Sequence, residues 1–143
     1  MATPTDKQIS GMAGEFLTAG KLFKLGLQAA VTLGNAKSVD ILAYNPQNTK
    51  NYNVQVKTNR EKNCFLISKE NVFSEQIYVF VLLNSPSQNE EFFIVKGQTL
   101  LDNIHHFWGA SYKEGKKTNM PAINYGPLKE FKNNWNIFLN KKL

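Results

Sequence analysis

The sequence of 143 residues lacks the features that define several protein classes. It has one cysteine, Cys64, which excludes an internal disulfide, and no group of residues has the spacing of a zinc site. No apolar run approaches the ~20 residues that are needed to span a bilayer. The polar stretch 1–11 has no apolar centre of the kind found in secretory signals. These absences predict a soluble, cytoplasmic protein.

Arginine is also scarce. Arg60 is the single arginine, and the other 16 of the 17 basic residues are lysines. Arginine is the residue that most often reads base edges with two hydrogen bonds, so sequence-specific base reading is not favoured. The net charge of +6 divides into +3 over residues 1–57, −2 over 58–110 and +5 over 111–143. Basic ends favour a nucleic-acid partner, although lysines also solubilise any surface.

The composition is otherwise that of a globular protein, with 42% hydrophobic and 12% aromatic residues. That balance excludes a disordered chain and a collagen-like repeat. A chain of this length buries roughly 68–70% of its unfolded surface and needs no covalent staple. Residues 1–143 are therefore expected to form a single domain.

An amphipathic helix is predicted over residues 7–26. Its apolar residues recur at helical spacing and form one stripe, made of Ile9, Met12, Ala13, Phe16, Gly20 and Phe23. Thr5 or Asp6 is suited to cap the start, and Gly26 is suited to the end. Glu15 lies about 60° from the edge of the stripe, so we expect it between the core and solvent.

Short β-like runs follow this helix, separated by turns that are rich in Pro, Asn and Ser. Strands are predicted at 28–33, 38–44, 52–58, 64–68, 77–84 and 92–97. Apart from Asn84, the run at 77–84 is continuously apolar, which is typical of a strand covered on both faces. A helix is predicted over 98–108 and a lysine-rich loop over 111–120, followed by a closing helix or an irregular packed end. This order predicts an α+β or a mixed-sheet α/β fold.

Four polar positions combine into a candidate site. Side chains alternate along a strand, so Asp40 is expected to face away from its apolar neighbours, while Gln55 and Lys57 share one face of the next strand. The Asn-rich turn between the two strands would pair them as a hairpin. A suitable register then brings the three side chains to one side of the sheet, and the first helix can lay Glu15 over the same point.

This group of side chains has a chemical logic. Carboxylate and amide oxygens are hard ligands that suit Mg²⁺. A bound metal can orient a water molecule and stabilise charge that develops on a phosphate, and a nearby lysine can steady the same charge. The pattern therefore indicates a metal site for phosphate chemistry. The alternative interpretation is that these residues belong to an ordinary half-exposed strand without a site, because such a strand also has alternating polar residues.

The ordered set resembles the PD-(D/E)xK, or restriction-endonuclease-like, nuclease superfamily. The matching features are Glu15 on a helix, Asp40 on a strand and the Gln-Val-Lys run 55–57 on the following strand. Within the superfamily, residues 11–58 look like its small Holliday-junction-resolvase-like and uncharacterised bacterial members. The resemblance implies an α/β fold with a mixed β-sheet core flanked by helices, and a Mg²⁺- or Mn²⁺-dependent DNA endonuclease.

The resemblance also implies roles for individual residues. Asp40 matches the metal-binding Asp, Gln55 stands where most members have Glu or Asp, and Lys57 matches the catalytic Lys that also contacts nucleic acid. Glu15 matches the helix acid of several branches, and the carbonyl of Val56 would be a further metal ligand. Members of the superfamily often dimerise, so a homodimer is implied as well.

Two positions depart from the pattern. Val39 stands where Pro or Gly is common, and Gln55 removes a negative charge from the site. The lost charge should weaken Mg²⁺ binding. It favours an alternative in which the chain is a catalytically silent DNA-binding or protein-interaction module on the same fold. Both functions stay open at this point, as does the choice between DNA and RNA.

The basic stretch 111–143 supplies candidates for contacts with a nucleic-acid backbone. Lys113, Lys116 and Lys117 lie beside Tyr112 in the predicted loop. Contacts with phosphate would make binding fall steeply with salt. The alternative is a loop whose lysines are merely solvated.

Overall fold

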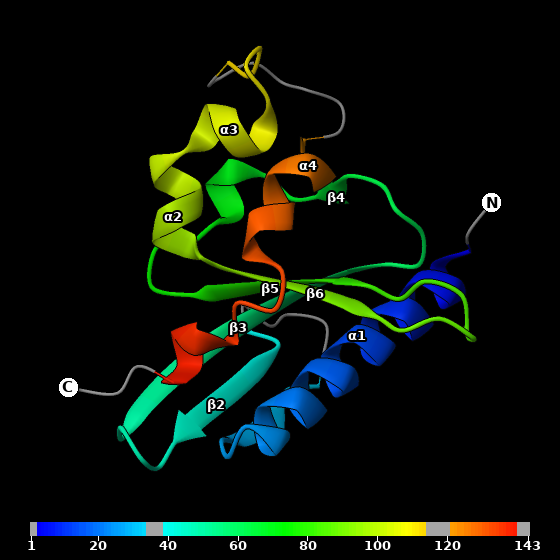
Figure 1. Ribbon diagram of the computed structural model, residues 1–143. Helices are drawn as coiled ribbons and strands as arrows, with labels where there is room; N and C mark the ends of the chain where they lie inside the picture. The colour runs from blue at the N-terminus through cyan, green and yellow to red at the C-terminus, as the bar shows by residue number, and fades with distance from the viewer. Residues whose placement is uncertain (1–2, 34–38, 114–120, 140–143) are drawn as a thin grey trace.

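The computed structural model describes residues 3–33, 39–113 and 121–139. At its centre lies a five-stranded sheet with the order β1-β2-β3-β5-β6 (Figure 1). Its strands are β1 (Gln28–Val31), β2 (Ile41–Asn45), β3 (Lys50–Asn59), β5 (Ile77–Leu82) and β6 (Glu91–Lys96). β3 and β5 are parallel and the other neighbours are antiparallel. The predicted mixed sheet with flanking helices is confirmed.

The helix α1 (Pro4–Lys24) covers one face of this sheet (Figure 1). It begins three residues earlier than predicted, because Thr3 and Asp6 form a capping box. The Thr3 hydroxyl accepts from the Asp6 N–H at 3.1 Å, and the Asp6 carboxylate accepts from the Thr3 N–H at 3.0 Å. The helix ends before Gly26, whose φ of 94° favours glycine, as expected.

The stripe that was expected to be the buried face of α1 faces solvent instead. Ile9, Phe16 and Phe23 are exposed. The buried positions are small or polar, with Leu22 as the one large apolar exception: Ser10, Gly14, Glu15, Thr18, Ala19 and Leu22. Periodicity located the helix correctly but not its orientation, because small residues let the backbone of α1 approach the sheet closely.

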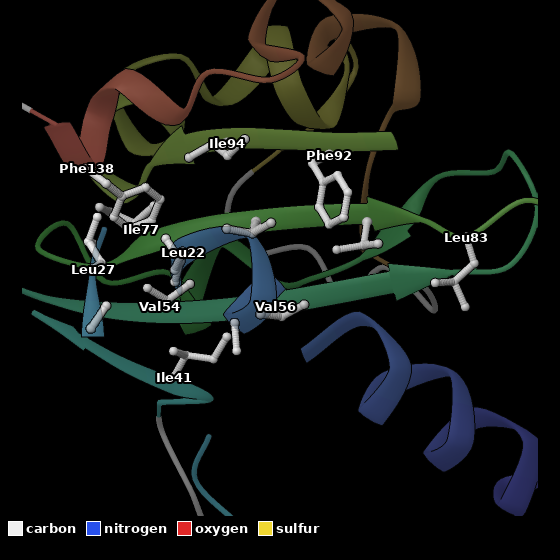
Figure 2. Close-up of a cluster of buried hydrophobic side chains, with 14 residues drawn as sticks. Leu22, Leu27, Ile41, Val54, Val56, Ile77, Leu83, Phe92, Ile94 and Phe138 are labelled. Carbon is white, nitrogen blue, oxygen red and sulfur yellow. The ribbon is translucent and has the colours of Figure 1, made fainter. Parts of the chain in front are cut away.

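Between α1 and the sheet lies a mainly aliphatic cluster, here called the α1-side core (Figure 2). Its largest members are Leu22, Leu27, Ile41, Val54, Val56, Ile77, Val79, Val81, Phe92, Ile94 and Phe138. Phe138 comes from η3 (Trp135–Leu139), whose carbonyl at Phe138 accepts a hydrogen bond from Asn45 at 2.8 Å. The C-terminal segment thus closes the end of this core.

The opposite face of the sheet is covered by short elements (Figure 1). They are η1 (Lys69–Asn71), α2 (Gly97–Asp102), α3 (Ile104–Trp108), α4 (Tyr125–Leu128), η2 (Lys129–Phe131) and the pair β4 (Phe65–Leu66) and β7 (Ala122–Ile123). The helix predicted over 98–108 is divided at Asn103, whose φ is −134°. The strand β7 was not predicted. A membrane crossing would need a longer and more apolar helix than any in the described part of the chain.

These elements enclose a second cluster, here called the aromatic core. It consists largely of Phe65, Tyr78, Phe80, Leu82, Phe93, Val95, Leu100, Phe107, Trp108, Ile123 and Leu128. Every residue of β5 is buried, because alternate side chains enter the two cores. The prediction of a strand covered on both faces is confirmed.

Candidate functional site

The regular pairing of β2 with β3 ends at Asp40. The place where the two strands separate is here called the fork. The N–H and C=O of a residue in a regular ladder point toward the same neighbouring strand. The Asp40 N–H donates to the Val54 carbonyl on β3, whereas the Asp40 carbonyl accepts from the Thr32 N–H beside β1, each at 2.9 Å. The backbone is therefore bulged at Asp40, a distortion that re-aims a side chain.

The Asp40 carboxylate occupies the fork. Its Oδ2 accepts a hydrogen bond from the Val56 N–H at 2.8 Å, and the residue is 8% exposed. This bond takes the place of the ladder bond that a longer β2 would supply. The Val56 carbonyl points to the same side of β3 as its N–H. The Val56 carbonyl therefore faces the side of β3 on which the Asp40 carboxylate is fixed.

Glu15 approaches the same stretch of β3 from α1. The preceding residue, Gly14, lies so close to β3 that an added Cβ would be 1.9 Å from the Thr58 Oγ1. Thr58 is two residues from Val56, where the Asp40 carboxylate is anchored. Glu15 is 8% exposed. Asp40 and Glu15 are thus both largely buried, and the helix residue next to Glu15 packs against β3 two residues from the Asp40 anchor.

Two buried hydroxyl groups accompany Glu15. The Oγ1 atoms of Thr18 and Thr58 have no hydrogen-bond partner within the described structure. Thr18 follows Glu15 by nearly one helical turn. Thr58 lies against Gly14, the residue before Glu15. A buried hydroxyl without a partner costs about 1–3 kcal/mol, and such costs are kept mostly where a site uses them. Sequence reasoning missed both threonines, although polar residues at helix positions 15 and 18 were the available signal.

Gln55 and Lys57 lie on the other face of β3, partly exposed. They alternate with Val54 and Val56, which enter the α1-side core. Their partners on β5 are Tyr78 and Phe80, which belong to the aromatic core. The expected common face of Gln55 and Lys57 follows from this alternation. The face of β3 that carries Gln55 and Lys57 is not the face that α1 covers. Glu15, on α1, therefore belongs to the opposite side of the sheet from these two side chains.

The convergence of all four side chains on one pocket stays a prediction. The described residues contain no group of three or more His, Cys, Asp or Glu side chains that form a metal cluster. The Asp40 carboxylate lies at the fork, and the prediction adds to it the Glu15 carboxyl, the Val56 carbonyl and the Gln55 amide as further donors. All are oxygens, the donor type that suits Mg²⁺ or Mn²⁺. The bond from Val56 fixes the orientation of one carboxylate, so the residues fit such an ion by chemistry.

Of the three lysines of the 111–120 segment that were predicted to contact nucleic acid, one belongs to the residues that the structure describes. Lys113 is exposed beside α3, whereas Lys116 and Lys117 lie outside the described residues. A different pair of lysines stands over one aromatic ring: the Nζ atoms of Lys62 and Lys129 are 4.7 Å and 5.6 Å from the Tyr125 ring centroid. Sequence reasoning did not find this group, because its members come from separate segments of the chain.

Two solved structures resemble the whole of this fold. One is a bacterial homing endonuclease, I-Ssp6803I, with a TM-score of 0.56, 14% identity, and coverage of 97% of this chain and 93% of that chain. The other is Hjc, a Holliday junction resolvase from the archaeal hyperthermophile Archaeoglobus fulgidus, with a TM-score of 0.57, 14% identity, and coverage of 93% and 98%. No family model and no curated protein matches the sequence. At this identity the likeness establishes the fold.

Proposed function

We propose that this chain is a metal-dependent DNA endonuclease that hydrolyses phosphodiester bonds with a water molecule. The observation that carries the proposal is the fork, where the largely buried Asp40 carboxylate is held by the Val56 N–H. A buried carboxylate fixed by a backbone bulge is a costly arrangement, which is typical of a functional site. The likeness of the fold to two DNA-acting enzymes supports the same conclusion.

In this proposal Asp40, Gln55 and the Val56 carbonyl hold Mg²⁺ or Mn²⁺, with Glu15 on the metal side. The bound ion supplies water activation and neutralises charge on the phosphate. The Val56 N–H keeps the Asp40 carboxylate aimed at the fork. Lys57 offers an ammonium group from the adjacent face to the phosphate of the scissile bond.

The neutral Gln55 supports a second candidate, a catalytically silent DNA-binding or protein-interaction module on the same fold. A site with fewer negative charges holds Mg²⁺ weakly, so DNA phosphate has to complete it. Metal binding should then be detectable mainly in the complex with DNA. Substitution of Gln55 by Glu restores the missing charge and separates the two candidates.

The decisive experiment is Mg²⁺- or Mn²⁺-dependent nicking of linear and branched DNA. Wild type should cleave, Gln55→Glu should bind metal more tightly and keep or raise cleavage, and Asp40→Ala should abolish it. Lys57→Ala should lower cleavage without preventing DNA binding. The matched control is Asp102→Ala on α2, an exposed Asp that accepts a hydrogen bond from Gln98. If wild type and Gln55→Glu bind DNA but are both inert, the silent module is the correct function.

The lysines that contact DNA can be identified from salt dependence. Each phosphate contact contributes about one unit to the slope of log K against log salt. Neutralising Lys113, Lys116 and Lys117 together should flatten that slope if the 111–120 segment touches phosphate. Neutralising Lys62 and Lys129 tests the group around Tyr125 in the same way. An unchanged slope means that the set in question only solubilises its surface.

A further inference from the structure

The outer side of α1 carries an apolar patch. Ile9, Phe16 and Phe23 are 53%, 58% and 56% exposed on this one helix. Beside them a groove of about 490 Å³ runs between α1 and β1, which is an edge strand of the sheet, and Leu33 lines it at 76% exposure. Scattered exposed apolar residues need no explanation, but a contiguous patch marks an interaction surface.

The spacing of the patch is that of a helix that packs on another helix. Ile9, Phe16 and Phe23 follow one another at intervals of seven residues. A seven-residue apolar repeat keeps one seam toward a partner helix. No helix in the described part of this chain lies along that seam, since the residues are exposed. A helix of another chain is the kind of partner that fits such a seam.

The same stripe is complementary to itself when it is reversed. A two-fold axis through Phe16 sets this residue against the partner's Phe16 and sets Ile9 against the partner's Phe23. It also sets Met12 opposite the partner's Gly20, so that a long side chain meets a position without one. An interface of a two-fold dimer requires this kind of self-complementarity.

The charges on α1 agree with the reversed pairing. Asp6 and Lys24 lie near opposite ends of the helix, both about 80° from Phe16 on the same flank. In an antiparallel pair related by a two-fold axis, the same flank of each helix lies on the same side of the interface. Asp6 of one copy therefore lies near the partner's Lys24. Asp6 is ionised at neutral pH, as an ordinary Asp is, and hydrogen bonds from the Thr3 backbone and side chain lower its pKa further. Antiparallel helix dipoles add to the attraction.

We infer that α1 is a dimerisation helix, and that its occupant is a second copy of this chain, docked antiparallel along the Ile9–Phe16–Phe23 stripe. This inference does not rest on the proposed nuclease chemistry. It names the surface of the homodimer that the family resemblance implied only in general terms.

The first test is the molar mass of the full chain, measured by sedimentation or light scattering over a series of concentrations. Wild type should form dimers as concentration rises. Phe16→Glu should weaken dimerisation at least tenfold, because it places two carboxylates on the two-fold axis. The matched control is Phe73→Glu, a Phe that is 49% exposed outside the patch, which should leave the dimer intact. A wild type that stays monomeric, or a Phe16→Glu dimer of unchanged affinity, overturns the inference.

The second test reports geometry and does not depend on affinity. In a Cys64→Ser background, Phe16→Cys should form an intermolecular disulfide under mild oxidation, because the axis brings the two copies of this position together. Lys21→Cys, exposed on another side of α1, should cross-link much less. Equal cross-linking at both positions contradicts the pairing along the stripe. Lys24→Glu should weaken the dimer and reverse its salt dependence, because it sets like charges opposite each other.

Discussion

The two faces of the sheet bury different chemistry. In the aromatic core the polar groups are paired: the Tyr78 hydroxyl accepts from the Phe73 N–H at 2.8 Å, and the Trp108 indole donates to the Ile67 carbonyl at 2.9 Å. The α1 side instead buries Glu15 together with hydroxyl oxygens that have no partner in the described structure. Unpaired buried polar groups lower stability and persist where function requires them. We therefore expect the aromatic face to contribute more to stability than the α1 face, which carries Glu15 and the unpaired hydroxyls.

The lengths of the elements explain why the aromatic face has to be the stable one. Its helical pieces have three to six residues, too few to be helical without tertiary contacts. Edge-on ring contacts hold them against the sheet, as in the pairs Phe65–Phe80 at 5.2 Å and Phe93–Tyr125 at 5.5 Å between centroids. α1 has 21 residues and its own capping box. It can therefore carry buried polar groups without losing its helical structure.

The largest expected change in the free energy of unfolding comes from a substitution in the aromatic core. Phe80→Ala should lower the free energy of unfolding by about 3–5 kcal/mol, because it removes a fully buried ring. The matched control is Val79→Ala, the neighbouring residue on β5, which is equally buried but enters the α1-side core. Its cost should be about 2 kcal/mol. Equal losses in urea denaturation would show that the buried Phe80 ring contributes no more to stability than the smaller Val79 side chain on the α1 side.

The second effect is on the close contact between α1 and β3. Gly14→Ala places a Cβ 1.9 Å from the Thr58 Oγ1, so overpacking should cost about 1–3 kcal/mol. Gly11→Ala on the same helix meets no atom within 4 Å and should instead stabilise by about 0.5–1 kcal/mol. Thermal denaturation of both variants measures the difference. A second substitution, Thr58→Ala, should restore part of the loss in Gly14→Ala.

Sequence patterns predicted the elements of the sheet more accurately than the helices. The strand of β5 and the hairpin of β2 and β3 follow from apolar runs and an Asn-rich turn, both of which are local signals. The orientation of α1 was predicted wrongly, since its apolar stripe faces outward. Periodicity shows that a helix has two faces, but whether the chain's own core or another molecule covers the apolar one is decided by contacts beyond the helix.

The candidate site shows the same limit. Asp40, Gln55 and Lys57 could be selected from alternation and order, because strand neighbours are set locally. The bulge at Asp40 and the bond from Val56 were not predictable, since they depend on where β2 stops pairing with β3. The group around Tyr125 was missed for a similar reason, as its lysines come from distant segments.

A smaller effect is expected at Thr18, whose hydroxyl is buried without a partner. Thr18→Val has nearly the same volume and removes that hydroxyl, so it should stabilise the protein by about 1 kcal/mol. If the hydroxyl belongs to the site, the same variant should cleave DNA more slowly than wild type. Thr5→Val, an exposed position of the same helix, should change neither quantity. A destabilised Thr18→Val would contradict the view that α1 buries polar groups at a cost.

The smallest effect concerns an ion pair beside the aromatic core. The Lys132 Nζ is 3.1 Å from the Glu91 carboxylate, and the Tyr125 hydroxyl donates to Glu91 at 3.5 Å. Burial acts to raise the pKa of Glu91, but hydrogen bonds from Lys132 and Asn84 and the charge of Lys132 outweigh it, so this pKa lies below its ordinary value. Because the Lys132 side chain is 49% exposed, solvent screens the pair and its contribution stays below about 1 kcal/mol.

The sign of the pH dependence follows from that lowered pKa. Unfolding raises the pKa of Glu91 to its ordinary value, so its contribution is complete above that value and is lost as pH falls through the lower folded-state pKa. Wild type should therefore be slightly more stable than Glu91→Gln at about pH 7, and the two should converge at an acid pH below the folded-state pKa of Glu91. Urea denaturation at both pH values measures this. In a double-mutant cycle, Lys132→Met should cost less in the Glu91→Gln background than in wild type. Equal costs would mean that the ion pair of Glu91 and Lys132 contributes nothing to the stability of the aromatic face.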